Sequence, residues 1–227
     1  MFAQKLTPPI PSEDIRQEAK KAFGFDLKNE QLDIVTKIEE RQDCILIAGT
    51  GWGKTLIYFF PLILWPKTTI LIVTPLKVLG DEQVEKLTSL GINSIHLKSE
   101  MFIPIQSLIE GRYKAIFVSP EILFASNALS TLWMDQCWKR RLLAAVVDEA
   151  HCIGTWGGKF RTDYEKLGYL RSFVDRGTCF VAVSATLPPQ LLSNVKIVMR
   201  FKDPYVVKVE SLITHGIDYQ ILHILDQ

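Results

Sequence analysis

Short runs of apolar residues recur along the chain, and most are followed by segments whose apolar positions repeat every three to four residues. Short, wholly apolar runs bounded by polar or glycine-rich residues are typical of strands buried on both faces of a parallel sheet. A repeat of three to four residues predicts amphipathic helices. The pattern therefore predicts five buried strands, at residues 44–48, 69–74, 115–119, 143–147 and 179–184.

The predicted helices begin near the N-terminus and then alternate with the strands. A helix is expected over residues 12–24, because a serine in the capping position precedes two acidic residues, and a second is expected over residues 29–42. Further helical patterns lie at 79–90 and 165–175. Strands that alternate with helices form βαβ units, so we expect a three-layer α/β fold around a mostly parallel central sheet.

The two ends of the chain differ from this alternating region. Three prolines before Ser12 favour an extended arm, and the strand-like segment after Pro204 has no evident place in the sheet. We therefore expect three parts: residues 1–22 as an arm with a short helix, 23–204 as the main α/β lobe, and 205–227 as a tail or the start of a truncated second lobe.

Composition narrows the class of protein. With 227 residues, 48% of them hydrophobic and 22% charged, the chain can bury a core. A net charge of +1 gives no overall nucleic-acid signature, so any such binding must be local. Four scattered cysteines without a CxxC pair argue against zinc and against a disulfide framework. No signal peptide or membrane span is evident, so a soluble, intracellular protein with no membrane partner is expected.

The segment CILIAGTGWGKTL combines a buried strand, a glycine-rich turn and the start of a helix. This is the context of a P-loop, whose backbone N–H groups and helix N-terminus bind phosphate. Lys54 would reach the outer phosphates and the Thr55 hydroxyl would hold Mg²⁺. A glycine turn that binds nothing is the alternative. The predicted nucleotide ligands in this loop are Thr50, Gly51, Trp52, Gly53, Lys54 and Thr55.

Two acidic residues follow the strand LLAAVV. Ligands of open α/β sheets bind at the carboxyl ends of the strands, where Asp148 stands. Asp148 would coordinate the Mg²⁺ held by Thr55, and Glu149 would orient or deprotonate the attacking water. The alternative is that the two acids only cap the next helix.

Several segments together resemble the RecQ-like branch of the superfamily 2 DNA helicases. AGTGWGKT, DEAH and SAT resemble motifs I, II and III, and TPLKVLGDEQV and SPEIL resemble two further family segments. DEAHCIGTWGGKFRTDYEKLGYLR resembles the long family segment that contains an aromatic-rich loop. The resemblance covers about residues 23–187 and implies the first RecA-like lobe of a P-loop NTPase that uses ATP and Mg²⁺.

The resemblance also implies roles for individual residues. Phe25, Lys28 and Gln31 resemble the adenine-reading motif, and His151 would join the catalytic network. DNA, single-stranded or partly duplex, is the implied partner, and a nuclear location is implied for a eukaryotic source and a cytoplasmic one otherwise. For Ser184 and Thr186 the sequence equally suits helix capping. The residues implied to couple ATP to DNA are Thr74, Pro75, Leu76, Ser119, Pro120, Glu121, Trp156, Phe160, Arg161, Ser184 and Thr186.

This sequence departs from the family pattern at several positions. Ala48 replaces the first glycine of the loop, and Lys28 stands where arginine is usual. The aromatic-rich loop lacks four polar or proline residues of the family, so its polar contacts are expected to differ. The corresponding residues here are Thr155, Gly158, Lys159 and Thr162.

A second helicase lobe is not expected within these 227 residues. Such lobes supply arginines that stabilise the transition state of phosphoryl transfer. Two functions remain open: the ATP-binding lobe of a 3′–5′ DNA helicase, which is weak or inactive as an isolated ATPase, or a nucleotide- and DNA-binding module with little turnover. A metabolic P-loop kinase is a third option, which leaves the aromatic-rich loop unexplained.

Overall fold

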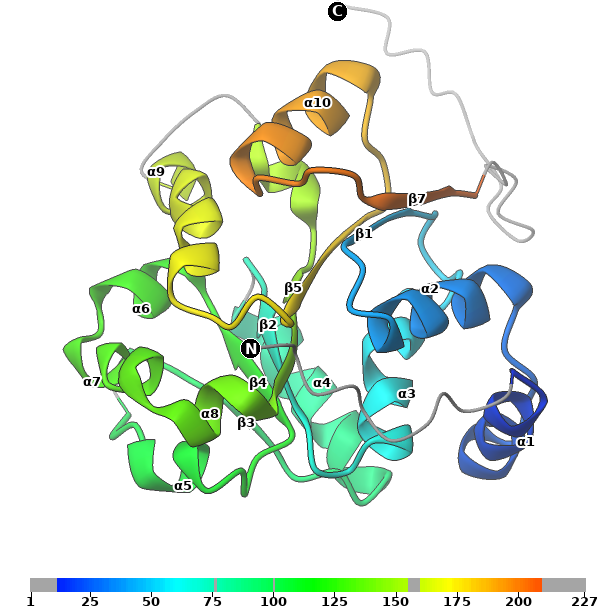
Figure 1. Ribbon diagram of the computed structural model, residues 1–227, viewed down its shortest axis with the longest axis horizontal. Coiled ribbons are helices and arrows are strands. Elements are labelled where there is room, and N and C mark those ends of the chain that lie inside the picture. The colour runs from blue at the N-terminus through cyan, green and yellow to red at the C-terminus, as the bar shows by residue number, and fades with distance from the viewer. Residues whose placement is uncertain (1–11, 76, 100, 155–159, 210–227) are drawn as a thin grey trace, which may run out of the picture.

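The computed structural model describes residues 12–75, 77–99, 101–154 and 160–209, and these form an α/β lobe built on one sheet (Figure 1). The sheet has seven strands in the order β3-β4-β2-β5-β6-β1-β7, and every pairing is parallel. The strands are β1 (Cys44–Ile47), β2 (Thr69–Val73), β3 (Ser94–His96), β4 (Ala115–Val118), β5 (Leu142–Val147), β6 (Cys179–Ser184) and β7 (Tyr205–Lys208).

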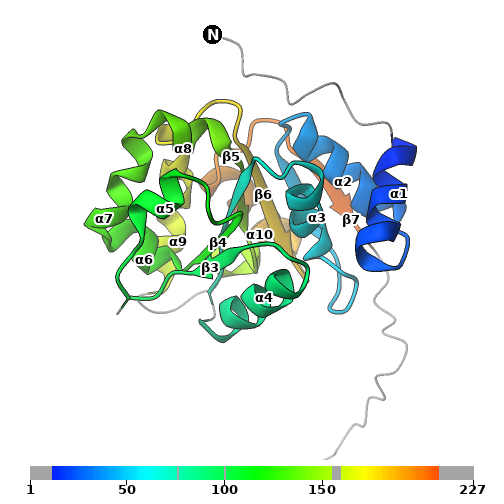
Figure 2. The same cartoon turned by 90° about the horizontal axis from the view of Figure 1, so that it is seen from below.

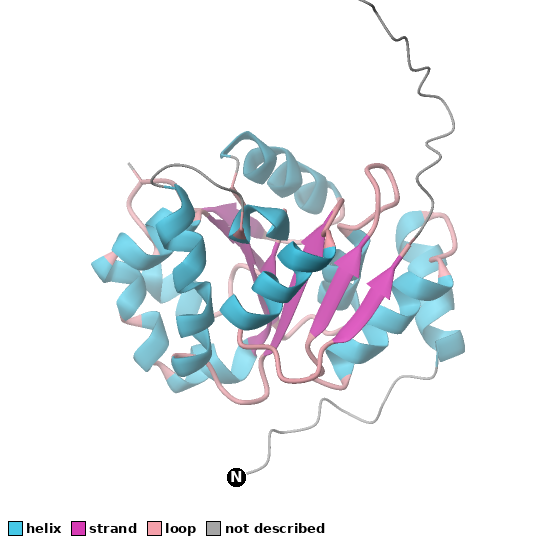
Figure 3. Cartoon of the chain, turned by 90° about the horizontal axis from the view of Figure 1, so that it is seen from above, coloured by secondary structure: helices cyan, strands magenta, loops and turns pink. Residues whose placement is uncertain are grey.

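Helices cover both faces of the sheet, which gives the three layers visible in Figures 2 and 3. One face is covered by α1 (Ser12–Phe23), α2 (Asn29–Glu39), α3 (Leu56–Leu64) and α4 (Lys77–Ser89). The other is covered by α5 (Ile105–Ile109), α6 (Pro120–Ala125), α7 (Asn127–Ser130), α8 (Gln136–Arg141), α9 (Phe160–Glu165) and α10 (Pro189–Val198), with the 3₁₀ turns η1 (Leu132–Met134), η2 (Ala150–Ile153) and η3 (Lys166–Ser172).

Alternation along the strands divides the core between the two faces. In β1, Cys44 and Leu46 join the cluster under α1 to α3, whereas Ile45 and Ile47 join the cluster on the opposite face. Side chains of a strand point to alternate faces, so an apolar run packs against both helix layers at once. This explains why the strand segments are wholly apolar. Within the described residues, no helix is both long and apolar enough to span a membrane.

The structure confirms the α/β fold class and the five predicted strands, each to within one residue at either end. The expected position of the last strand-like segment was wrong. Tyr205–Lys208 was expected outside the sheet, but it forms β7 and pairs in parallel with β1. Only Val207 of this strand is buried, because β7 lies at the edge of the sheet. The short strand β3 was not predicted; its central residue is only partly buried.

The helix predicted over residues 165–175 is only partly correct. The α-helix α9 ends at Glu165, and η3 continues as a 3₁₀ helix to Ser172. At Gly168 an added Cβ would lie 2.0 Å from the backbone oxygen of Val198, so this segment packs directly against the end of α10. Glycine is needed here for close approach of two backbones.

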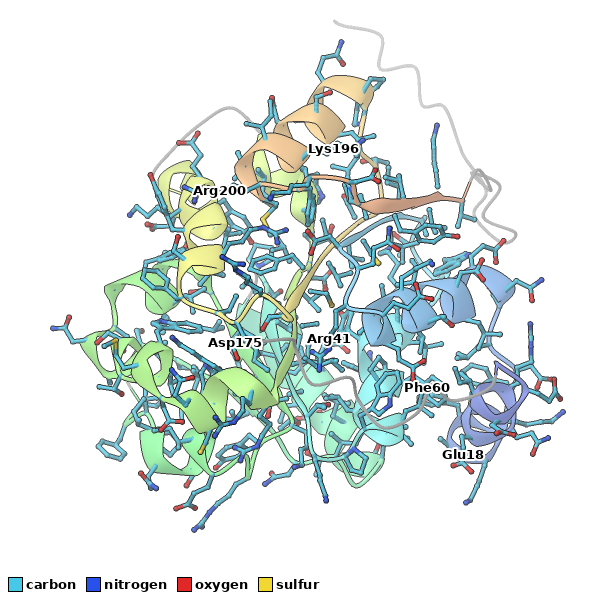
Figure 4. All side chains as sticks on the ribbon, viewed as in Figure 1. Glu18, Arg41, Phe60, Asp175, Lys196 and Arg200 are labelled. Atoms are coloured by element: carbon cyan, nitrogen blue, oxygen red, sulfur yellow. The ribbon has the colours of Figure 1, made fainter. Side chains whose placement is uncertain are left out.

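Polar side chains form hydrogen bonds that connect the amino ends of the central strands. Arg171 donates to Asp43 at 2.6 Å and to the carbonyl of Met199 at 2.7 Å, and its guanidinium lies 4.1 Å from the centre of the Phe180 ring. The second oxygen of Asp43 accepts the N–H of Phe180 at 2.8 Å. Arg41, labelled in Figure 4, similarly donates to the carbonyl of Leu143 at 3.0 Å. These contacts join β1, β5, β6 and the α10 region.

We predict that Asp43→Ala lowers the free energy of unfolding by about 3 kcal/mol, because it leaves the Arg171 guanidinium without its carboxylate partner and the Phe180 N–H without its acceptor. Urea denaturation measures the change. Asp26→Ala is the matched control: Asp26 also forms an ion pair, with Lys20, but both side chains are more than half exposed. Exposed pairs contribute about 0–1 kcal/mol. Equal losses in the two variants would contradict the prediction.

Candidate nucleotide-binding site

The candidate residues lie at one edge of the sheet. Because all strands run in the same direction, their carboxyl ends lie together at this edge. Ligands of such sheets bind there. Across five neighbouring strands, from β4 through β2, β5 and β6 to β1, the first residues beyond the strands or at their ends are Ser119, Thr74, Asp148, Ser184 and Ala48.

Backbone hydrogen bonds continue past the strand ends and hold these segments in register. The N–H of Asp148 donates to the carbonyl of Val73 at 2.9 Å, so the first acid is fixed against β2. The N–H of Ala48 donates to the carbonyl of Ser184 at 3.1 Å. The start of the P-loop is therefore bonded directly to the segment SAT at the end of β6.

The loop between β1 and α3 has the backbone conformation that its glycines permit. Gly51 and Gly53 have φ angles of 80° and 93°, in the region that side-chain-bearing residues rarely adopt. The N–H of Trp52 donates to the carbonyl of Gly49 at 3.3 Å, which closes the turn. Helix α3 then starts immediately after Thr55, so the loop leads into a helix N-terminus, where backbone N–H groups favour an anion.

Lys54 and Thr55 stand at the junction of this loop with α3. The ammonium of Lys54 donates to the carbonyl of Gly49 at 3.1 Å and so spans the loop. Thr55 occupies the cap position of α3 without making a side-chain cap hydrogen bond. Its hydroxyl therefore remains available to a ligand at the helix N-terminus.

Asp148 faces the P-loop helix across the edge of the sheet. Its two carboxylate oxygens accept from the Tyr58 hydroxyl, at 3.2 Å, and from the N–H of Glu149, at 3.0 Å. Burial and the charge of Glu149 raise the pKa of the Asp148 carboxyl, and the Lys54 charge acts in the opposite direction. Lys54 and Asp148 come from two separate segments, and the charge of Lys54 acts on the Asp148 carboxyl across this edge; Thr55 adjoins Lys54 in the sequence.

Glu149 adopts a strained backbone conformation. Its φ and ψ angles of 51° and 47° are left-handed, which is uncommon for a residue other than glycine, asparagine or aspartate. Strain of this kind is typical of functional sites, where surrounding contacts hold it in place. The Glu149 carboxylate lies 3.1 Å from Nδ1 of His151.

His151 joins the acidic pair to the end of β6. Its Nδ1 lies 3.1 Å from the Ser184 hydroxyl as well as 3.1 Å from the Glu149 carboxylate. Ser184 donates its single hydroxyl proton to the carbonyl of Thr186 at 2.9 Å. Ser184 therefore accepts from the histidine, and this network assigns the proton to Nδ1. Ser184 is wholly buried, whereas Thr186 is exposed.

The three residues expected to meet the base lie beside the same loop. Phe25 is 49% exposed, and its ring stacks on Phe23 with the centroids 5.8 Å apart. The Lys28 ammonium lies 5.1 Å from the centre of the Trp52 ring. Gln31 is only 2% exposed, and its amide nitrogen points to the carbonyls of the P-loop.

The residues expected along the DNA-facing edge are only partly described. Thr74 and Ser119 are buried at neighbouring strand ends, beside the partly buried Pro75 and the buried Pro120. Glu121 is partly buried. One oxygen of Glu121 and the hydroxyl of Thr74 are buried with no hydrogen-bond partner among the described residues.

The aromatic-rich loop lies mostly outside the part that the structure describes. Leu76 and Trp156 fall outside the described residues, as do the side chains of Phe160 and Arg161. The backbone of these last two residues begins α9, which packs against α6 and against the turn η2 that carries His151. The chain beyond the loop thus returns to the candidate site.

Sequence analysis missed Tyr58. Its hydroxyl is the only side-chain donor to the Asp148 carboxylate among the described residues, and burial raises its pKa well above the ordinary value. A signal for it was present. Tyr58 lies four residues after Lys54, in the first turn of α3, and is the one hydroxyl in the otherwise apolar helix LIYFFPLIL.

Comparison with known proteins identifies the family. Residues 28–195 match the DEAD/DEAH box helicase family. The chain is 33% identical over 216 residues to ATP-dependent DNA helicase Q5 of Rattus norvegicus, with 90% of this chain and 22% of that protein covered. It is 34% identical over 188 residues to the probable ATP-dependent DNA helicase RecS of Bacillus subtilis (strain 168), with 80% and 36% covered.

Solved structures with the same fold include the DUF1998 helicase MrfA, with a TM-score of 0.66 at 18% identity over 88% of this chain and 33% of that one. The Pyrococcus furiosus Hef helicase domain gives a TM-score of 0.57 at 19% identity over 86% and 40%. The chain spans about a fifth of the length of helicase Q5. The chain belongs to the DEAD/DEAH box helicase family, as a RecA-like lobe whose relatives include RecQ-like DNA helicases.

Proposed function

We propose that this chain is the ATP-binding lobe of a RecQ-like, ATP-dependent 3′–5′ DNA helicase. The lobe binds Mg-ATP and single-stranded DNA, and it couples hydrolysis to strand separation when a second lobe is present. The observation that carries the proposal is the meeting of two segments about ninety residues apart: the P-loop helix donates from Tyr58 to Asp148, and Lys54 is close enough for its charge to act on the Asp148 pKa.

The triphosphate would lie in the glycine-rich turn. The loop from Thr50 to Thr55 leads into the N-terminus of α3, and Gly51 and Gly53 keep the approach free of side chains. Among the described residues, the Lys54 ammonium donates to one neutral carbonyl, and it would exchange this contact for the stronger one to phosphate. The base would stack on the exposed face of Phe25.

The residues present fit a magnesium ion that is shared with the nucleotide. Burial of the Asp148 carboxylate next to Glu149 leaves excess negative charge, which favours a divalent cation. Among the described residues no three potential metal-ligating side chains gather, so Thr55 and Asp148 would be supplemented by phosphate oxygens and water, as Mg²⁺ prefers. When bound, the ion neutralises charge on the β- and γ-phosphates.

Glu149 would act on the attacking water. It is adjacent to Asp148, and its contact with His151 orients the carboxylate. A carboxylate in this position accepts a proton as the water attacks the γ-phosphorus and the bond to the β-phosphate oxygen breaks. Through His151 and Ser184, loss of the γ-phosphate would reach the backbone at the start of the P-loop.

DNA would follow the β4 and β2 side of the same edge. Thr74 and Ser119 lie buried at neighbouring strand ends, and polar groups along this edge would contact phosphates without reading sequence. The names of the relatives, which are DNA helicases, support DNA as the partner, and a nuclear or cytoplasmic location follows from it. The segment that begins with Trp156 would link the bound DNA strand to the ATP site.

The rate of ATP hydrolysis with and without single-stranded DNA tests this function. Stimulation of the isolated chain by DNA supports a lobe that couples the two ligands. Binding of both ligands without turnover favours the nucleotide- and DNA-binding module, and phosphate transfer to a small molecule favours a kinase. Arginines of a second lobe raise such rates by about 1,000-fold or more, so the rate expected for the isolated lobe is low.

We predict that Lys54→Ala weakens Mg-ATP binding by about 10- to 100-fold, because a charge-assisted hydrogen bond contributes about 1.5–3 kcal/mol. Isothermal titration calorimetry measures the affinity. Lys67→Ala serves as the control, since Lys67 is an exposed lysine just before β2, at the opposite edge of the sheet. An unchanged affinity in Lys54→Ala would exclude the phosphate site.

We predict that Glu149→Gln keeps Mg-ATP affinity within about threefold while turnover falls by about 100-fold or more, because an amide cannot accept the proton of the water. Single-turnover hydrolysis separates the two effects. Glu110→Gln, at an exposed acid that pairs with Arg112, should change neither. A collapse of affinity would show that Glu149 supports the fold of the site and does not act on water.

We predict that Trp156→Ala reduces the stimulation of ATP hydrolysis by single-stranded DNA and leaves ATP affinity unchanged, because base stacking on an aromatic ring contributes about 1–3 kcal/mol. The ratio of the rates with and without DNA measures the coupling. If ATP affinity fell and the stimulation remained, Trp156 would belong to the nucleotide site.

A further inference from the structure

The edge of the sheet opposite the nucleotide site, which we call the amino edge, carries a local excess of positive charge. The segments 110–114, 66–68, 139–141 and 175–178 precede β4, β2, β5 and β6, which are neighbours in the sheet. They contain two acids and seven basic residues: Lys67, Arg112, Lys114, Lys139, Arg140, Arg141 and Arg176. Because the net charge of the whole chain is only +1, the excess belongs to this edge and not to the protein as a whole.

Most of these positive charges have no carboxylate partner. Glu110 pairs with Arg112 at 2.8 Å. Within the part of the chain that the structure describes, the other six basic residues and Asp175, which is labelled in Figure 4, form no ion pair. Asp43, which precedes β1, is already bound to Arg171. The charge of the amino edge is therefore not balanced within the described lobe.

Two of the basic residues, Lys114 and Arg141, contact the same loop. The Lys114 ammonium donates to the carbonyl of Gly111 at 3.1 Å, and the Arg141 guanidinium donates to the carbonyl of Ile109. Burial and the charge of Arg141 lower the pKa of Lys114. Both side chains meet neutral carbonyls and each other's positive charge, which raises the free energy of the protein in the absence of an anion. A phosphate beside them would relieve this repulsion.

Compensation of helix dipoles accounts for only part of this charge. Residues 139–141 lie in the last turn of α8, where cations are favourable. Lys67, Lys114 and Arg176 lie in turns and loops outside the helices. Helix dipoles therefore do not explain why basic residues precede four neighbouring strands.

The basic residues form a row along the edge. Neighbouring strands lie about 4.8 Å apart, so the four strand starts from β4 to β6 span about 14 Å. Duplex DNA carries one negative charge per about 1.7 Å of its axis, so this length of duplex carries about eight phosphate charges. Lys67, Arg140 and Arg176, which precede three of the four strands, are exposed. The row is therefore long enough for several contacts to one duplex.

The residues between the cations favour contacts to phosphates over contacts to bases. Proteins hold single strands largely by stacking the bases on aromatic rings. In the four segments the only aromatic residue is Tyr113, which is half-buried and packs against the core. Basic residues without stacking rings bind the phosphates of a duplex and do not read its sequence.

We infer that the amino edge binds the phosphate backbone of duplex DNA, through the exposed Lys67, Arg140 and Arg176 together with the half-buried Lys114 and Arg141. The choice of DNA as the polyanion rests on the proposed function. The surface itself is separate, because it lies at the edge opposite the proposed ATP and single-strand sites. The lobe would then hold the duplex part of a partly unwound substrate at one edge and the separated strand at the other.

Fluorescence anisotropy tests the inference, with a labelled DNA duplex of about 20 base pairs titrated without nucleotide at several salt concentrations. Each contact to phosphate releases counterions, so five contacts predict a slope of about −4.5 for log K against log salt concentration. The affinity should then fall by about 500-fold between about 50 and 200 mM salt. Absence of duplex binding, or a slope shallower than about −2, would overturn the inference.

A double variant, Arg140→Ala with Arg176→Ala, locates the contact. Loss of two contacts should make the slope shallower by about 2 and weaken duplex binding by about 60-fold at about 0.1 M salt. The matched control is Lys20→Ala with Lys21→Ala, which removes the same charge from the exposed end of α1 and should change the affinity by less than about threefold. Equal losses in the two double variants would show general electrostatic attraction and refute a surface at the amino edge.

Other ligands separate a duplex surface from the remaining possibilities. Binding of a single strand of the same length should not depend on Arg140 and Arg176, and a loss confined to the single strand would contradict the inference. Poly-glutamate, or vesicles of phosphatidylcholine and phosphatidylserine, should bind more weakly than the duplex. Binding of either as tight as that of the duplex, and lost in the same variant, would assign the surface to an acidic protein or to a membrane instead.

Measurements of ATP hydrolysis keep this inference apart from the proposed function. Hydrolysis, and its stimulation by single-stranded DNA, should be unchanged in the Arg140→Ala, Arg176→Ala variant. If the chain binds duplex through these residues and hydrolyses no ATP, the proposed function fails and the inference stands. If it hydrolyses ATP with stimulation by single strands and binds no duplex, the inference fails and the proposed function stands.

Discussion

The parallel direction of all seven strands is the constraint on which the site depends. A parallel strand must be followed by a crossover, so every strand in this sheet ends at the same edge and every connection starts there. At this edge the N–H groups of Asp148 and Ala48 bond to the ends of neighbouring strands, which fixes the loops that follow them. The phosphate loop, the acidic pair and the SAT segment share this edge for that reason, although the sequence separates them by many residues.

Burial raises the pKa of acidic groups at this edge. The carboxylate of Asp148 lies in an apolar surrounding beside a second acid, and burial also raises the pKa of the nearby thiol of Cys152. Within the described residues the cation that acts on Asp148 is Lys54, whose ammonium is held by a carbonyl of its own loop. The two acids therefore carry more negative charge than Lys54 offsets, and a divalent cation at the proposed magnesium position would supply the balance.

Much of the fold was predictable because apolar runs specify buried strands directly. The strands β1, β2, β4, β5 and β6 were recognised because both of their faces are covered. The edge strands β3 and β7 were not placed, since partial exposure gives them mixed sequences. The 3₁₀ form of η3 depends on packing against α10, which no local pattern encodes.

The candidate site shows the same division between local and spatial information. The P-loop and the acidic pair follow from residue types and their order. The contacts of Tyr58 with Asp148 and of Gln31 with the loop carbonyls join segments far apart in the chain, so only the structure reveals them. The sequence shows the residue type of Gln31 and not the direction of its amide.

The left-handed backbone of Glu149 lowers the stability of the fold at a position where the proposed hydrolysis needs a carboxylate. Glycine or asparagine would adopt this conformation with less strain, so natural selection for folding alone would not retain a glutamate here. A related protein that no longer hydrolyses nucleotide would not need a carboxylate at position 149. Glycine or asparagine would then be expected there, so the residue at this position indicates whether hydrolysis is retained.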